Sequence, residues 1–168
     1  MSIAASLLPE FDHEMAGARR ALERVPDTSF AFTPHEKSLS MQGLVTHLAN
    51  LPHWTTVTVE TDELDMDAPD GAAQRAEPVG STSEALQMFD RNVAAAREAL
   101  AGASDETLLG PWTLRSQGQT AFTMPKVAVL RSFVMNHMIH HRGQLTVYLR
   151  LNDVPLPALY GSSADEQS

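Results

Sequence analysis

Three histidines fall within five positions of the stretch NHMIHHRGQ, at His137, His140 and His141. Imidazole nitrogens bind divalent metals and exchange protons near neutral pH, so the cluster could hold a metal ion, take part in acid–base chemistry or pack inside a core. His137 and His141 are four residues apart, which places two rings side by side on one face of a helix. The same geometry lets the two histidines of an H-E-x-x-H helix chelate zinc.

This cluster lies in the middle of a helix predicted from about Pro125 or Lys126 to Leu151. At about 100° per residue, His137 and His141 point into the apolar sector of that helix. The sector is formed by Leu130, Val134, Leu145 and Tyr148. The arginines project to the opposite flank or away from the sector: Arg131, Arg142 and Arg150. The helix therefore has a polar face that the two histidines do not use.

The residues around the pair are less decisive. His140 lies about 80° from the centre of the apolar sector, so we expect it to border the core, where it packs or supports a ligand. Gly143 inside a helix suggests that another backbone or helix comes close at this point. Arg142 and Gln144 could anchor a neighbouring chain or orient a ligand, and a solvated Arg142 is an equal alternative.

A catalytic metal site usually has a third protein ligand and an open position for water or substrate. His47 stands in the apolar stripe of a helix predicted over roughly residues 40–60, which Pro52 should kink. A lone inward histidine is more often a hydrogen-bonded core residue, but three neutral imidazoles in one apolar interior are hard to satisfy that way. The alternatives for His47, His137 and His141 are thus a metal site and a buried neutral cluster. His13, His35 and His53 do not share a helical face with another histidine in this way, and we assign them no role.

Four predicted helices must position these side chains. Apolar periodicity and capping residues place them over about residues 6–25, 40–60, 81–101 and 125–151. Residues 62–80 are acidic and rich in Ala, Pro and Gly, which predicts a mobile surface crossover between the second and third helices. Residues 111–125 could form a small hairpin or an irregular loop. We predict an all-α four-helix bundle, with residues 152–168 as a C-terminal tail.

Length and composition limit the classes of function. The 168 residues fit one domain over 1–168. Twelve basic residues against 21 acidic ones give a formal net charge of -9, which argues against nucleic acid and anionic membranes as partners. No cysteine is present, so a metal would need imidazole or oxygen ligands. No apolar run approaches the roughly 20 residues that span a bilayer, and we expect a cytoplasmic protein.

Two stretches resemble the DinB-like (YfiT-like) superfamily of metalloenzymes. The C-terminal one is HMIHHRGQLTVYLRLNDVPLPALYGSSADE, and the stretch that resembles the family's first-histidine helix is SLSMQGLVTHLANLPHW. The resemblance implies a four-helix bundle of up-down-down-up topology, commonly a homodimer, with one divalent metal held by His47, His137 and His141. Ser162 stands where proline is common in the family, which bears on the rigidity of the tail and not on the ligands.

Some members of this superfamily are similar to transferases or isomerases that use mycothiol, bacillithiol or glutathione. We therefore expect a zinc or nickel ion that activates a low-molecular-weight thiol or water for attack on an electrophilic small molecule, in stress response or detoxification. No carboxylate falls in a convincing position for a general base, which favours thiol transfer over a metal-dependent hydrolase. Two competing hypotheses are a non-catalytic metal- or small-ligand-binding stress protein and a purely structural dimeric bundle.

Overall fold

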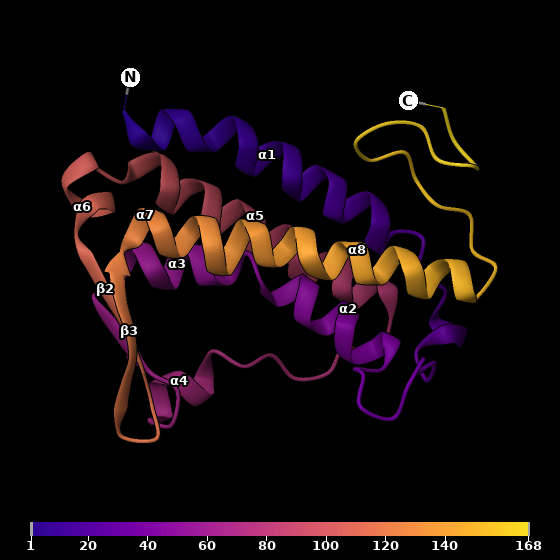
Figure 1. Cartoon of the computed structure of the whole chain (residues 1–168), viewed down its shortest axis with the longest axis horizontal. Helices are drawn as coiled ribbons and strands as arrows, with labels where there is room; N and C mark the ends of the chain where they lie inside the picture. Colours follow the sequence, from indigo (N-terminus) through magenta and orange to yellow (C-terminus); the bar gives the residue numbers. More distant parts are fainter. Residues whose placement is uncertain (1, 168) are drawn as a thin grey trace.

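Helices form most of the structure, and a three-stranded sheet lies at one end (Figure 1). The computed structural model describes residues 2–167. Its longer helices are α1 (Ile3–Leu22), α2 (Met41–Asn50), α3 (His53–Glu60), α5 (Thr82–Gly102) and α8 (Asn136–Leu151). The shorter segments are η1 (Asp27–Ser29), α4 (Pro69–Ala73), α6 (Asp105–Leu109), α7 (Lys126–Val129) and the π-helix η2 (Leu130–Met135). The strands are β1 (Glu63–Asp65), β2 (Pro111–Ser116) and β3 (Gln119–Pro125).

Serine side chains fix where three of the longer helices begin. The hydroxyl oxygens of Ser2, Ser40 and Ser81 accept hydrogen bonds from backbone N–H groups of the first turns of α1, α2 and α5. Ser81 and Glu84 are spaced as in a capping box, but the Glu84 carboxylate accepts the N–H of Gly80 at 2.6 Å, one residue before the N-cap serine. Pro52 was predicted to kink the second helix, and the helix divides there into α2 and α3.

The predicted fourth helix is continuous but not uniform. It begins as α7, passes through the π-helix η2 and continues as α8. The N–H of Asn136 donates to the carbonyl of Arg131, five residues earlier, instead of four as in an α-helix. The turn therefore contains an extra residue, just before the helical stretch that carries His137 and His141.

The prediction of an all-α fold is wrong, because residues 63–65 and 111–125 form a sheet of strand order β1-β2-β3. Strands β2 and β3 pair as an antiparallel hairpin, and β1 pairs parallel to β2. The hairpin turn has positive φ at Gln117 (53°) and Gly118 (71°), as the twist of a tight hairpin favours. Of the hairpin and the irregular loop predicted for residues 111–125, the hairpin is confirmed. The predicted 62–80 crossover does link α3 to α5, but β1 and α4 lie within it.

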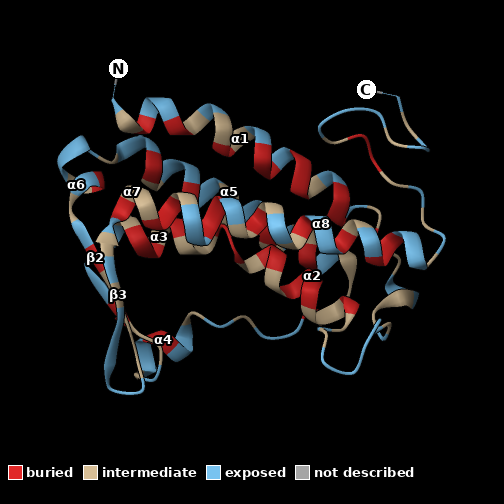
Figure 2. Cartoon of the chain, viewed as in Figure 1, coloured by how far each residue is buried: buried red, intermediate tan, exposed pale blue. Residues whose placement is uncertain are grey.

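Buried residues follow the facing sides of α1, α2, α5 and α8 (Figure 2). The main core is contiguous through these helices and includes Phe11, Leu44, Phe89 and Leu145. A second, smaller cluster joins the sheet to α3 and α7 and consists of Val57, Leu64, Trp112 and Val129. This smaller cluster holds the hairpin against the helices. In the part of the chain that the structure describes, no helix is long and apolar enough to cross a membrane.

Arg142 lies inside the core, so the prediction that it projects away from the apolar sector is wrong. Its side chain forms an ion pair with Glu14 of α1 at 2.7 Å, and the two residues are only 2% and 5% exposed. Arg142 also donates to the Glu14 carbonyl at 3.0 Å, while the Tyr160 hydroxyl of the tail donates to the Glu14 carboxylate at 2.6 Å. A Cβ at Gly17 would lie 2.6 Å from the guanidinium. The glycine thus leaves the space that Arg142 needs.

Candidate metal centre

The structure brings together His47 from α2 with His137 and His141 from α8. The Nε2 atoms of His47 and His137 are 3.2 Å apart, and those of His137 and His141 are 2.8 Å apart. One nitrogen from each ring lies within 4.8 Å of the other two. Two nitrogens bound tetrahedrally to zinc at 2.0–2.1 Å would be roughly 3.3 Å apart. The three predicted residues therefore form a group of the right size to hold one metal ion.

The other ring nitrogens show which atoms are free to bind a cation. Nδ1 of His141 is 2.7 Å from Oε1 of Gln144, and Nδ1 of His137 is 3.3 Å from the Phe133 carbonyl oxygen. Both oxygens accept, so each Nδ1 carries the proton and each Nε2 presents a lone pair. Two lone pairs facing each other at 2.8 Å repel, and a cation between them removes that conflict. The donor set therefore fits a divalent metal that prefers imidazole.

The pKa values of the three rings favour neutral imidazoles. Burial, together with repulsion from His141 and His137, lowers the pKa of His47 to about 4. Burial also lowers the pKa values of His137 and His141. All three imidazoles are therefore predominantly neutral at pH 7, which is the protonation state that metal binding requires.

His140 stands outside this group. Its ring centroid is 4.9 Å from that of His141, but the residue is exposed, so the expectation that it borders the core is wrong. The Gln144 side chain is hydrogen-bonded to His141 and so fixes the orientation of this imidazole. The hydrogen bond between His137 and the Phe133 carbonyl was not predicted. Every residue has a backbone carbonyl, so the residue types in the sequence do not indicate this contact.

Two cavities share His47 as a lining residue. One has a volume of about 230 Å³, is lined mostly by apolar side chains and borders both His47 and His137. The other has a volume of about 510 Å³, borders His47 and has the polar lining residues Gln42, Asn50, Gln74 and Arg75. Trp54 and Met66 line both cavities. His47 thus lies between an apolar cavity and a second cavity of mixed lining, which we call the polar cavity for its amide and guanidinium groups. The spacing of residues along the chain does not indicate this arrangement.

The fold and the converging imidazoles define a mostly helical protein with a three-histidine site that could hold a metal ion. The model of the DinB family matches residues 1–167. The chain therefore belongs to the DinB family, as the resemblance of its two histidine-containing stretches had indicated. No curated protein gives a significant match.

Solved structures support the fold. A DinB-like protein of Bacillus subtilis is 19% identical, with a TM-score of 0.70 over 90% of this chain and 96% of that one. A DinB-like protein of Bacillus cereus is 18% identical, with a TM-score of 0.72 over 95% of this chain and 98% of that one. At these identities the two structures establish the shared fold alone.

Proposed function

We propose that the protein is a metal-dependent enzyme that transfers a low-molecular-weight thiol to an electrophilic small molecule, in stress response or detoxification. His47, His137 and His141 would hold one divalent ion, with zinc or nickel as the candidates. When bound, the ion supplies positive charge that stabilises a thiolate near neutral pH. The observation that carries the proposal is the convergence of three neutral imidazoles, one of which, His47, lines both cavities.

The polar cavity supports a thiol as cosubstrate. Low-molecular-weight thiols of the mycothiol, bacillithiol and glutathione type carry polar groups, and bacillithiol and glutathione also carry carboxylates. Asn50, Gln74 and Arg75 could bind such groups by hydrogen bonds and by charge. The chain contains no cysteine, so an external thiol would provide the sulfur nucleophile.

Water activation is supported less well. A hydrolase that uses this site would need a general base within hydrogen-bond reach of the attacking water. Among the described residues that line the two cavities, none is Asp or Glu. In a thiol transfer the sulfur instead gains a bond to the electrophilic carbon, the leaving group departs with its electron pair, and the thiol proton passes to solvent.

Thiol consumption tests this proposal. Tag-free protein loaded with zinc or nickel is incubated with glutathione, bacillithiol or mycothiol and an alkyl or aryl halide. We expect at least one thiol to be consumed about a hundredfold faster than with the His47→Ala variant, since a metal can contribute several kcal/mol to charge stabilisation. Metal-loaded wild type that is no faster than His47→Ala across the panel would favour a non-catalytic metal-binding protein instead.

We further propose that the chain forms an up-down-down-up four-helix bundle that assembles as a homodimer. In support of the topology, α1 and α8 run in one direction along the molecule while α2, α3 and α5 run in the other (Figure 1). In support of the dimer, α8 exposes Val147 (57%) and Leu151 (59%) on the face that carries His140. The expected close neighbour of Gly143 is not found in the described chain, where a Cβ at this position would meet no neighbouring element within 4 Å.

Substitution of this face should separate the subunits. We expect Val147→Glu to weaken self-association at least about tenfold, because two apolar contacts would be replaced by two facing carboxylates. Multi-angle light scattering at several protein concentrations measures the effect. Leu109→Glu is the matched control, since Leu109 of α6 is 60% exposed and lies on a different helix. A monomeric wild-type protein at 100 μM, or an equal effect of Leu109→Glu, would contradict the proposed interface.

A further inference from the structure

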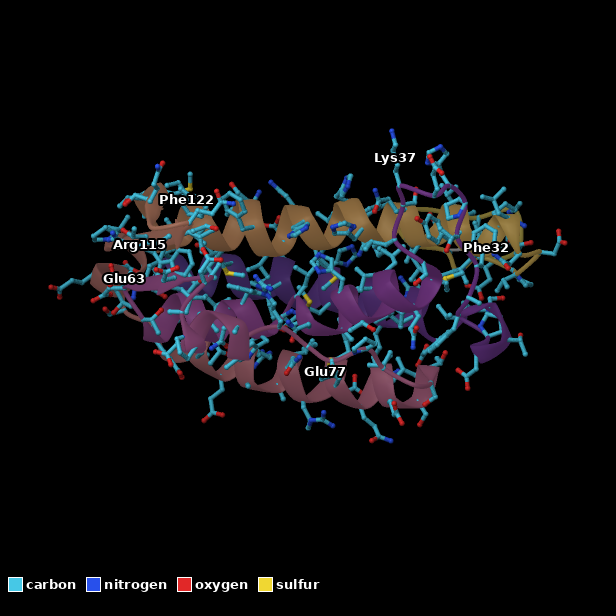
Figure 3. All side chains as sticks on the ribbon, turned by 90° about the horizontal axis from the view of Figure 1, so that it is seen from below. Phe32, Lys37, Glu63, Glu77, Arg115 and Phe122 are labelled. Carbon is cyan, nitrogen blue, oxygen red and sulfur yellow. The ribbon has the colours of Figure 1, made fainter. Side chains whose placement is uncertain are left out.

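The apolar cavity beside the histidines has walls from several parts of the chain. Leu51 lies between α2 and α3, and Trp54 lies in α3. Leu114 and Phe122 come from the hairpin, and Phe133 comes from the π-helix. The rings of Phe122 and Phe133 stack at 4.6 Å between centroids with 12° between their planes. Figure 3 shows Phe122 at the sheet end of the molecule, far from Phe32 at the other end. The hairpin therefore completes the cavity.

The volume of this cavity indicates a small occupant. Protein interiors pack with few voids larger than a water molecule, and an apolar cavity of about 150 Å³ binds benzene. The cavity here has a volume of about 230 Å³. It can therefore hold a molecule of one ring with substituents, or of two small fused rings.

The lining of the apolar cavity also limits the charge that a bound molecule can carry. Among the described residues that line the cavity, none is Asp, Glu, Lys or Arg. The side chains that offer polar atoms other than indole nitrogen are those of Thr58, His47 and His137. A charged group placed among the apolar walls would lose its hydration without a partner. Two of these three polar side chains, His47 and His137, belong to the candidate metal site. A polar atom of the occupant is therefore best placed at the end of the cavity that these two histidines line.

We propose that this cavity binds an uncharged, largely apolar molecule of one or two rings, with its polar or reactive atom facing His47 and His137. The inference rests on the proposed function in assigning this molecule as the electrophile, since the polar cavity would take the thiol. The binding itself depends on the walls and needs no metal. The substrate class is therefore an aromatic or compact aliphatic electrophile rather than an anionic one.

Intrinsic fluorescence tests the proposal, because both tryptophans of the chain, Trp54 and Trp112, line the cavity. The probes are p-nitrotoluene and p-nitrobenzoate, which share a quenching nitroaromatic ring and differ in charge. With free N-acetyltryptophanamide as the correction for absorption and collisional quenching, we expect saturable quenching by p-nitrotoluene and at least tenfold weaker binding of p-nitrobenzoate. Equal affinities, or no saturable quenching by p-nitrotoluene, would overturn the inference.

A pair of variants locates the binding. Leu114→Asp places a carboxylate in the half-buried hairpin wall and should weaken p-nitrotoluene binding at least tenfold. Leu109→Asp makes the same change at an exposed leucine outside the cavity and should leave p-nitrotoluene binding unchanged. An equal loss in both variants would contradict the assignment.

A second comparison separates this binding from the metal site. His141 does not line the cavity, so His141→Ala and chelator-treated protein should still bind p-nitrotoluene. If they do while no metal binds the wild type, the proposed function fails and the apolar binding site stands.

Discussion

The variant His137→Ala should bind zinc or nickel at least about a hundredfold more weakly than the wild type. His137 is the central member of the group, since its Nε2 lies 3.2 Å from that of His47 and 2.8 Å from that of His141. Loss of a partner that only supports a ligand typically weakens metal affinity 10–100-fold, so loss of a ligand should exceed that range. Competition with a chromophoric chelator at pH 7.5, on protein purified without an affinity tag, measures the affinity.

The neighbouring histidine provides the matched control. His140→Ala removes an imidazole from the same helix, but His140 is exposed and lies outside the converging group. Its metal affinity should stay within about twofold of the wild type, as for a surface substitution away from the site. If both variants bind metal like the wild type, or if both lose it equally, the three-histidine assignment is wrong.

Glu14→Ala should lower the free energy of unfolding by about 3–5 kcal/mol, because it leaves the buried guanidinium of Arg142 without its carboxylate. The Tyr160 hydroxyl would also lose the carboxylate to which it donates. Urea unfolding followed by circular dichroism measures the change. The exposed pair Asp12 and Arg97 gives the comparison, since Asp12→Ala should cost no more than about 1 kcal/mol.

A double variant distinguishes a buried unpaired charge from lost packing. Glu14→Leu combined with Arg142→Met replaces both charges with apolar side chains, and such replacements are often neutral or stabilising. The double variant should therefore be more stable than Glu14→Ala alone. A Glu14→Ala protein as stable as Asp12→Ala would show that the ion pair contributes no more than a surface one.

The grouping of the three histidines could be predicted from sequence because its signals are local. His137 and His141 share a face by their spacing alone, and His47 stands in a periodic apolar stripe. Arg142 was misplaced for a physical reason. The buried positions Met138, Arg142, Leu145 and Leu149 follow one another at steps of four, three and four. The prediction instead centred the apolar sector on Leu130, Val134 and Tyr148, which left Arg142 outside it. Its partner Glu14 is 128 residues away in sequence, and no local pattern indicates that contact.

The sheet could be predicted only in part. The hairpin has alternating residues and a Gly-containing turn, which are local signals. Strand β1 has three residues, too few to show an alternation, and it pairs with β2 across fifty positions. The apolar cavity draws on this long-range pairing, since Met66, which follows β1, lines it together with Leu114 and Phe122 of the hairpin. A site built from non-local contacts leaves little trace in the spacing of any one segment.

The π-helix divides the last long helix into two stretches that need not keep a common phase. Residues after it set the angle between His137 and His141, whereas Val129 before it, and Phe133 and Val134 within it, face the cavity. Because the extra residue is accommodated in the wide turn, a change of length there would rotate the preceding stretch by about 100° relative to the histidines. Insertion or deletion of a single residue in η2 would thus change the shape of the apolar cavity, while the spacing of the two imidazoles on α8 would stay fixed.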